Sequence, residues 1–336
     1  MTAQMDTAPQ ARPQLSATDQ SENEREIVVS ARRDVADGVV ALELRDPTGA
    51  ELPPWEPGAH IDLILSDSLI RQYSLCGDPE DRTSWRIGVL REPGGRGGSA
   101  FIHDQLRVSS IVRVRGPRNH FLLDHAPSYL FITGGIGVTP ILAMVRAAAR
   151  AGADWRLIYS GRQLASMAFR DELLSYGSQV EFWPKDERGY APIAEAIKTI
   201  SRSESPLVYS CGPEGLLGAV TEACEVQGIS DRLRIERFKA GVEDFTPADT
   251  FKIVLNRSGL ELTVPPNKSI MEVCREAGVE VDSSCEAGIC STCETRVLSG
   301  VPDHRDSILT RREREAGKIM QVCVSRSVSD RLVLDL

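Results

Sequence analysis

The sequence predicts a multidomain α+β and α/β protein with three modules: an antiparallel β-barrel, a parallel α/β domain and a small C-terminal β-rich domain. Three observations predict this arrangement. Short β-type runs broken by turn residues fill the first third, strands alternate with helices in the middle, and a hairpin pattern opens the last 86 residues. At 336 residues the chain is too long for one ordinary core and suits two or three domains.

The composition excludes several classes of protein. An apolar fraction of 41% and a charged fraction of 26% are typical of a soluble globular chain. With 48 acidic and 39 basic residues, a net charge of −9 argues against nucleic-acid binding. We expect no membrane span, because no window approaches the ~20 apolar residues required. The opening residues lack the apolar core of a secretory signal. We therefore expect a cytoplasmic protein, whose eight cysteines indicate metal or redox chemistry rather than disulfides.

The first module follows a polar tail. Residues 1–25 are rich in Gln, Ala, Ser, Thr and Pro, a composition that predicts a flexible segment. Residues 26–126 contain the short strand-like runs GVVALELRD, HIDLILSD, RQYSL, WRIGVLRE and SIVRVRGP. Many short strands separated by Gly, Pro and Asp predict a closed antiparallel barrel.

The second module, residues 127–238, shows strands and helices in alternation. A strand at residues 129–133 leads through a glycine-rich turn into ILAMVRAAARAG, which is apolar at helical spacing and has Gly152 as its expected stop. WRLIYS, QVEFWP and PLVYSCG follow as strands, and FRDELLSYG, IAEAIKTI and EGLLGAVTEACEVQG follow as helices. This alternation predicts a parallel sheet covered on both faces.

The third module begins after a predicted linker at residues 239–250, which is acidic and contains a proline. Residues 251–336 open with FKIVLNRSGLELTVP, in which Arg257-Ser-Gly259 separates two alternating runs as in a β-hairpin. We found no internal repeat.

Four cysteines of the third module give the most specific signal. Cys285, Cys290 and Cys293 are followed by Cys323 after 29 residues, and C-x4-C-x2-C…C is the spacing of the plant-type [2Fe–2S] cluster. Gly288 allows the loop to turn without a Cβ clash. A structural zinc site is the alternative, but zinc loops favour C-x2-C pairs on both sides. We expect the other four, Cys76, Cys211, Cys224 and Cys274, to lack a metal, and Cys224 and Cys274, which fall within helical patterns, to be small core residues.

A glycine turn joins the first strand and helix of the second module. In GGIGVTP, residues 134–140, we expect Thr139 to cap the helix and Pro140 to be its first residue. A helix N-terminus with free amides suits a pyrophosphate, although Pro140 stands where the dinucleotide fingerprint needs a third glycine. A tight turn without a ligand is the alternative. Cys211-Gly212-Pro213 ends another strand at the same sheet edge, where ligands bind in α/β folds. The next strand ends in Ser160-Gly-Arg162; Arg162 would face a 2′-phosphate or cover the adenine.

The barrel carries a candidate anion site. Arg71, Tyr73 and Leu75 alternate along one strand face. The run GGRGGS, residues 94–99, exposes amides and the Ser99 hydroxyl, and six arginines lie between Arg91 and Arg118. We hypothesise a phosphate held by Arg71 and this glycine run; a solvated basic face with a flexible loop is the alternative.

Together, RQYSL, GGRGGS, GGIGVTP, CGP, ERF (residues 236–238) and CEAGICSTC with Cys323 resemble the phthalate dioxygenase reductase family, which includes the vanillate demethylase reductases. The resemblance covers residues 26–336. It implies an FMN-binding barrel at residues 26–126, an NAD-binding domain at residues 127–238 and a β-grasp ferredoxin domain at residues 251–336. It also implies FMN, NADH and a [2Fe–2S] cluster as cofactors.

The resemblance also implies roles for individual residues. The positions that would contact the flavin are Arg71, Gln72, Tyr73, Ser74, Val89, Gly97, Gly98, Ser99 and Thr139. The positions that would hold the nicotinamide cofactor are Gly134, Gly135, Gly137, Thr139, Arg162, Cys211, Gly212 and Pro213. The catalytic positions would be Ser74, Cys211 near the transferred hydride and Phe238, which would cover the flavin ring.

The implied activity is electron transfer from NADH through FMN and the cluster to the separate terminal component of a Rieske oxygenase. A flavin is needed between the two because nicotinamide gives two electrons at once and the cluster accepts one. Two alternatives remain at this point: a reductase for another acceptor such as a cytochrome P450, and a non-catalytic redox sensor.

Overall fold

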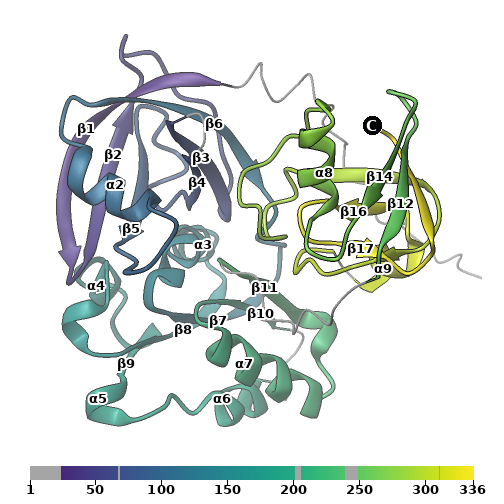
Figure 1. Cartoon of the computed structure of the whole chain (residues 1–336). Coiled ribbons are helices and arrows are strands. Elements are labelled where there is room, and N and C mark those ends of the chain that lie inside the picture. Colours follow the sequence, from purple (N-terminus) through teal and green to yellow (C-terminus); the bar gives the residue numbers. More distant parts are fainter. Residues whose placement is uncertain (1–23, 67–68, 201–205, 239–248, 310) are drawn as a thin grey trace, which may run out of the picture.

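The computed structural model describes residues 24–66, 69–200, 206–238, 249–309 and 311–336. Within these ranges each predicted module contributes one main sheet (Figure 1). The predicted tail and linker lie outside the described residues, except for residues 24–25 of the tail and residues 249–250 of the linker. None of the helices in the described part of the chain has both the length and the apolar character that a bilayer span requires.

The first module is a six-stranded antiparallel sheet with the strand order β4-β3-β6-β1-β2-β5. Its strands are β1 (Arg25–Ala36), β2 (Val39–Arg45), β3 (Ala59–Ser66), β4 (Leu69–Ser74), β5 (Trp85–Leu90) and β6 (Ile111–Asn119). A bridge between Leu75, directly after β4, and Ile87 in β5 joins the two edge strands. The sheet thus closes around fully buried side chains such as Leu42 and Trp85, and the predicted antiparallel barrel is confirmed.

One helix of this module was not predicted. The glycine run 94–99 leads directly into α2 (Gly98–Gln105), so its last two residues are helical rather than part of a loop. The sequence does not predict this helix because its apolar residues show too little periodicity. Only Ile102 and Gly98 of α2 are buried. The short helix lies against β4 and β5, the two edge strands of the sheet (Figure 1).

The second module is a parallel sheet with the order β11-β10-β7-β8-β9. Its strands are β7 (Ser128–Gly134), β8 (Asp154–Gly161), β9 (Val180–Pro184), β10 (Leu207–Cys211) and β11 (Leu233–Glu236). Its helices are α3 (Val138–Arg150), α4 (Arg170–Leu174), α5 (Lys185–Arg188), α6 (Ile193–Ile200) and α7 (Glu214–Val226). The edge strand β11 and the one-turn helix α5 were not predicted, because each is too short to show a period.

Both faces of the parallel sheet are covered, as predicted. Tyr129 and Phe131 of β7 pack in one core with α3. The alternate residues Leu130 and Ile132 pack in a second core with α6 and α7. Gly152 ends the α3 region with φ of +67°, the conformation expected of a glycine stop.

The start of α3 differs from the expectation. A 3-10 turn, Gly135–Gly137, precedes it, and Val138 is the first helical residue. Thr139 therefore lies inside the helix and does not cap it; its hydroxyl donates to the carbonyl of Ile136 over 2.9 Å. Pro140 is the third helical residue rather than the first. It is tolerated there because the amides of the first turn need no intrahelical partner.

The third module is a mixed five-stranded sheet with the order β13-β12-β18-β14-β16, beside a two-stranded pair, β15 and β17. Its elements are β12 (Phe251–Leu255), β13 (Leu260–Val264), α8 (Ile270–Glu276), β14 (Glu294–Ser299), β15 (Pro302–Asp303), α9 (Arg311–Ala316), β16 (Ile319–Gln321), β17 (Arg326–Ser327) and β18 (Arg331–Leu334). The hairpin between β12 and β13 turns at Gly259, with φ of +70°. The α8 helix packs against the sheet, and Cys274 is one of its buried residues. Cys224 is buried likewise in α7, as expected.

Candidate functional site

A cavity of about 570 Å³ lies where the three modules meet, and we call it the central cavity. Its walls come from β4, the glycine run 94–99, the start of α3, residues 235–238 and the third module. The residues predicted from the resemblance that line it are Arg71, Gln72, Tyr73, Ser74, Gly98, Ser99, Thr139 and Phe238. Val89 and Gly97 are not among the lining residues. Val89 is fully buried in the barrel core, and Gly97 precedes α2 with φ of +82°.

One end of the central cavity suits a phosphate. The guanidinium of Arg71 donates to the main-chain carbonyl of Arg96 over 2.6 Å, which holds the Arg71 side chain against the glycine run. Burial lowers the pKa of Arg71, and the charge of Arg96 lowers it further. The start of α2 has no side-chain cap, so its first amides are free to bind an anion. An anion here would relieve the repulsion between the arginines, and this end fits the phosphate of a flavin mononucleotide.

Two residues of the glycine run, Gly98 and Ser99, have structural contacts in addition to the predicted contact with a phosphate. A Cβ at Gly98 would lie 2.4 Å from Cγ of Arg71, so glycine is needed for the arginine to cross this position. The hydroxyl of Ser99 accepts a hydrogen bond of 3.0 Å from the backbone amide of Glu92. The hydroxyl therefore also serves to hold the glycine run in place.

Two histidines in the central cavity were missed at the sequence level. His60 and His120 line it, with ring centroids 5.5 Å apart. His60 is 6% exposed, and its Nε2 atom has no hydrogen-bond partner among the described residues. Burial holds the pKa of His60 well below 6.5, and the nearby charge of Arg118 acts in the same direction. A neutral, buried and unsatisfied ring nitrogen in a cavity wall offers a ligand one hydrogen bond. This candidate role follows from the pairing of β3 with β4, which places His60 opposite Ser74.

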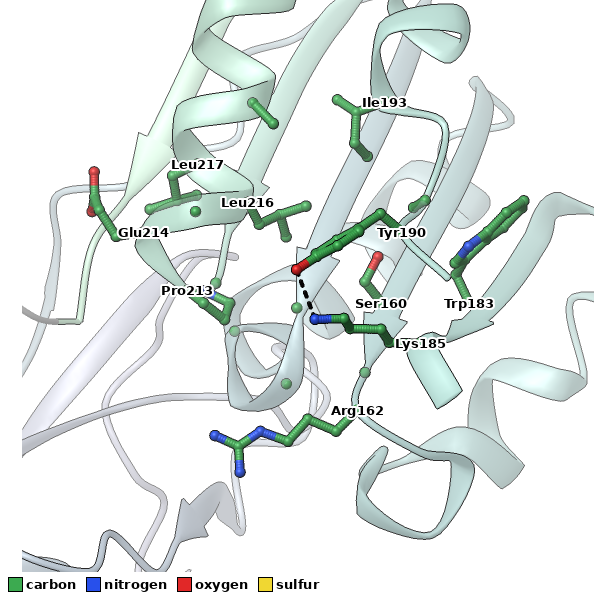
Figure 2. Close-up of a pocket in the computed structure, with 18 of the residues that line it drawn as sticks. Ser160, Arg162, Trp183, Lys185, Tyr190, Ile193, Pro213, Glu214, Leu216 and Leu217 are labelled. Atoms are coloured by element: carbon green, nitrogen blue, oxygen red, sulfur yellow. Dashed lines mark hydrogen bonds between the residues drawn. The ribbon is translucent and has the colours of Figure 1, made fainter. Parts of the chain in front are cut away.

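A second cavity of about 1710 Å³ lies at the carboxyl ends of β7, β8 and β10, and we call it the strand-end cavity (Figure 2). The predicted residues that line it are Gly134, Gly135, Gly137, Arg162, Gly212 and Pro213. Phe238, which is 37% exposed, lines both cavities. The two cavities therefore adjoin at this ring.

The glycines of the strand-end cavity bring two strand ends together. A Cβ at Gly137 would lie 2.3 Å from the carbonyl oxygen of Cys211, and one at Gly212 would lie 2.9 Å from the amide nitrogen of Gly134. Glycine is needed here for backbone to meet backbone. The result is a narrow rim of main chain at the edge of the sheet, as a pyrophosphate requires.

The far side of the strand-end cavity carries cations and aromatic rings. Figure 2 shows Lys185 directed to Tyr190. The ammonium group of Lys185 donates a hydrogen bond of 2.7 Å to the hydroxyl of Tyr190. Arg162 extends from the end of β8 away from this pair (Figure 2). Both cations line the strand-end cavity.

Cys211 does not line either cavity, contrary to what its predicted role would suggest. It is fully buried at the end of β10, beside Glu236 in the register with β11. Burial raises the pKa of the Cys211 thiol well above its usual range. Burial also raises the pKa of Glu236 to about 8, and the hydrogen bond from Cys211 offsets part of that rise. Glu236 lines the central cavity, and Cys211 lies directly behind it.

The four cysteines predicted to bind the cluster are all buried in the third module. The thiols of Cys285 and Cys290 lie within hydrogen-bond reach of each other, as do those of Cys293 and Cys323. Two pairs suit two metal ions with two thiolates each, whereas a structural zinc ion takes four converging ligands. No three candidate ligands among the described residues converge on one point as a single metal ion requires.

The loop at residues 284–293, which we call the cluster loop, directs backbone amides at one of its own cysteine sulfurs. The amides of Ala287 and Ile289 donate to Sγ of Cys285 over 3.3 and 3.4 Å. Gly288 adopts φ of +66°, and a Cβ there would lie 2.6 Å from the side chain of Val324. Amides directed at a thiolate sulfur stabilise its negative charge. Cys285 also lines the central cavity, so one of the predicted cluster ligands faces the candidate flavin site.

Comparison with known proteins agrees with this geometry. Residues 253–328 match the model of the 2Fe-2S iron-sulfur cluster binding domain, and residues 131–222 match the oxidoreductase NAD-binding domain. The chain is 41% identical to the phenoxybenzoate dioxygenase subunit beta of Ectopseudomonas oleovorans, over 90% of this chain and 94% of that protein. It is 38% identical to the vanillate O-demethylase oxidoreductase of Pseudomonas sp. (strain HR199 / DSM 7063), over 93% and 99%.

Two solved structures extend the comparison. Phthalate dioxygenase reductase matches with a TM-score of 0.69 and 36% identity, over 94% of this chain and 99% of that chain. An intact type IV self-sufficient cytochrome P450 monooxygenase matches with a TM-score of 0.85 and 41% identity. Here the likeness covers 97% of this chain but only 43% of the larger protein. The chain belongs to the family of iron–sulfur reductases that includes phthalate dioxygenase reductase and vanillate O-demethylase oxidoreductase, and it is an NAD(P)H-dependent oxidoreductase.

Proposed function

We propose that the chain is the NADH-dependent reductase component of a Rieske-type oxygenase or demethylase system, with a separate terminal oxygenase as its electron acceptor. One observation carries the proposal: Arg71, Tyr73, Phe238 and Cys285 line the same cavity. A flavin held there would face the cluster on one side and the strand-end cavity on the other. The overall reaction, NADH + 2 A(ox) → NAD⁺ + H⁺ + 2 A(red), balances for a one-electron acceptor A.

FMN is the flavin that the central cavity supports. When bound, a flavin accepts a hydride equivalent and releases electrons singly. Arg71 and the free amides of α2 would bind its phosphate. Tyr73 and Ser74 on β4 would position the ring, His60 would donate or accept one hydrogen bond, and Phe238 would cover the ring from the strand-end cavity.

The strand-end cavity would hold NADH. The glycine turn, Gly134, Gly135 and Gly137, with Gly212 and Pro213, would bind the pyrophosphate. Arg162 would contact the adenosine end. Glu236 lines the central cavity with Phe238, and Cys211 is buried behind Glu236. We assign this pair to support the nicotinamide ring where it meets the flavin. Burial suits such a role because it keeps water away from the transferred hydride.

The relatives support a multicomponent system. Dioxygenase and demethylase proteins are named among them, and nearly the full length of each is covered. A second acceptor class also has support, because the self-sufficient P450 monooxygenase has the higher structural similarity. In a P450 system the acceptor would be a haem protein. The NAD-binding domain argues against a sensor without turnover.

The test uses the purified holoprotein. Released flavin, iron and sulfide are quantified, and NADH and NADPH oxidation are measured with ferricyanide and with cytochrome c. We expect FMN, two irons per chain and a preference for NADH. Coupling is then compared between a Rieske oxygenase and a P450 from the same source. Coupled turnover with only the P450 would contradict the proposed acceptor, and iron-free protein from an anaerobic preparation would contradict the whole proposal.

The proposal includes a division of the chain and a compartment. We assign residues 26–126 to flavin binding, residues 127–238 to nicotinamide binding and residues 251–336 to the cluster, with a tail at residues 1–25 and a linker at residues 239–250. A cytoplasmic location would supply NADH and keep the eight cysteines reduced.

A further inference from the structure

We propose that Asp62 docks the cluster loop onto the barrel by accepting a hydrogen bond from Ser284, and that this contact positions the cluster against the flavin site. The inference rests on the proposed function, because it needs both cofactors in one chain. It assigns a positioning role to two residues that contact neither cavity.

Asp62 is a buried carboxylate with a full set of donors. It lies in β3 and is 0% exposed. One oxygen, Oδ2, accepts from Arg118 of β6 over 2.6 Å. The other, Oδ1, accepts from Gln72 of β4 over 3.0 Å and from Ser284 over 3.1 Å. A buried charge of this kind is stable only when paired and hydrogen-bonded. The barrel supplies two of the three donors and the third module supplies one.

The bond between Ser284 and Asp62 crosses between modules. The two residues are 222 positions apart in the sequence, and both are buried. Ser284 is 6% exposed. The third module therefore contributes a buried hydroxyl to a carboxylate on the face of β3 opposite the barrel core, where Ile61 and Leu63 point. Such a hydrogen bond fixes orientation more strictly than apolar contact would.

The neighbours of these residues connect the bond to electron transfer. Ser284 directly precedes the cluster ligand Cys285, and Gln72 stands between Arg71 and Tyr73 on β4. One carboxylate thus binds the residue next to the cluster and the residue between two flavin-cavity residues. Electron transfer between bound groups depends steeply on their separation, so a small displacement of the cluster loop would slow it.

The test compares Ser284→Ala with Ser283→Ala in the holoprotein. Ser283 is a matched control, because its hydroxyl contacts Arg275 and Glu286 inside the third module. Flavin and iron are quantified first. Cluster reduction after rapid mixing with NADH is then followed by its visible absorbance. Amide hydrogen exchange of residues 59–66 and 284–293 reports docking independently of turnover.

We expect Ser284→Ala to retain iron and flavin, to slow cluster reduction about 10-fold and to speed exchange in both segments. Ser283→Ala should match the wild type, and Ser284→Thr, which keeps the hydroxyl, should restore docking. Unchanged exchange and reduction in Ser284→Ala would overturn the inference, and so would loss of iron in that variant alone, which would make Ser284 a support of the cluster itself. A wild-type protein without flavin or cluster would instead refute the proposed function, and the exchange comparison would still report on docking.

Discussion

The thiol of Cys211 lies 3.9 Å from Oε2 of Glu236, and the two residues are paired across adjacent parallel strands, with Glu236 lining the central cavity and Cys211 buried behind it. Each is held in its neutral form because burial raises the pKa of both groups. The protein thereby places two uncharged proton carriers beside the point where the two cavities adjoin. The arrangement has a measurable consequence for stability.

Stability should fall with rising pH because of Glu236. Its pKa is raised to about 8 in the folded chain, so between its unfolded value near 4.3 and about 8 the folded state holds a proton that the unfolded state has lost. The free energy of unfolding should therefore decrease with pH in this window, by up to about 1.4 kcal/mol per pH unit. Glu236→Gln mimics the neutral carboxyl and should show a melting temperature that falls less between pH 5 and pH 8. Parallel curves for wild type and variant would refute this, and the exposed Glu225→Gln serves as the control.

Loss of one cluster ligand should separate the two halves of the relay. Cys293→Ser should abolish the visible absorption of the cluster and reduce cytochrome c reduction to background, because a two-iron cluster needs its four thiolates. Ferricyanide reduction by NADH should persist, since it needs only the flavin. Cys274→Ala, which removes a buried thiol outside the four ligands, should retain both activities. If both activities disappear in Cys293→Ser, the sites are not separate.

Removal of the phosphate ligand should empty the flavin site alone. Arg71→Ala should purify with little flavin and a normal iron content, because Arg71 and the start of α2 form the predicted phosphate site while the cysteines lie in another module. Flavin released by heat and iron measured by chelation give the ratio. Arg33→Ala removes an exposed arginine of β1 and should keep both. A normal flavin content in Arg71→Ala would remove the phosphate hypothesis.

Arg162 should affect NADPH more than NADH. It extends into the strand-end cavity where an adenosine would lie (Figure 2), and a 2′-phosphate would form a charged hydrogen bond with it. Arg162→Ala should lower kcat/KM for NADPH about tenfold or more and that for NADH much less. Steady-state rates with ferricyanide measure both. Equal losses would instead assign Arg162 to the adenine. The control is Arg156→Ala, in the strand β8 that directly precedes Arg162 and outside the cavity.

Much of the site was readable because its signals are local. The spacing of Cys285, Cys290 and Cys293 specifies a single loop around a cluster, and Gly288 adopts the positive φ that this loop needs. Strands with strong alternation or long apolar runs were found for the same reason. The four-residue strand β11 was missed because it is too short to show a period. The helix α2 was missed because only two of its residues are buried, and the twelve-residue strand β1 was also absent from the predicted runs.

Residues whose role depends on distant neighbours could not be read in this way. His60 became a candidate only when the register of β3 and β4 placed it opposite Ser74. Thr139 was expected to cap α3, yet the 3-10 turn at Gly135–Gly137 starts the helix earlier. No sequence pattern singles out Asp62, because its partner Ser284 lies 222 positions away in the chain.

The sequence by itself determined the modules and the kind of ligand each suits, because thiolate spacing, glycine turns and hydrophobic periods are properties of neighbouring residues. Only the tertiary structure decided how the modules face one another: that Cys285 lines the cavity formed by Arg71 and Phe238, that Cys211 lies behind its wall, and that Asp62 reaches Ser284. Such contacts depend on side chains from separate strands meeting in three dimensions, and no local pattern in the chain encodes them.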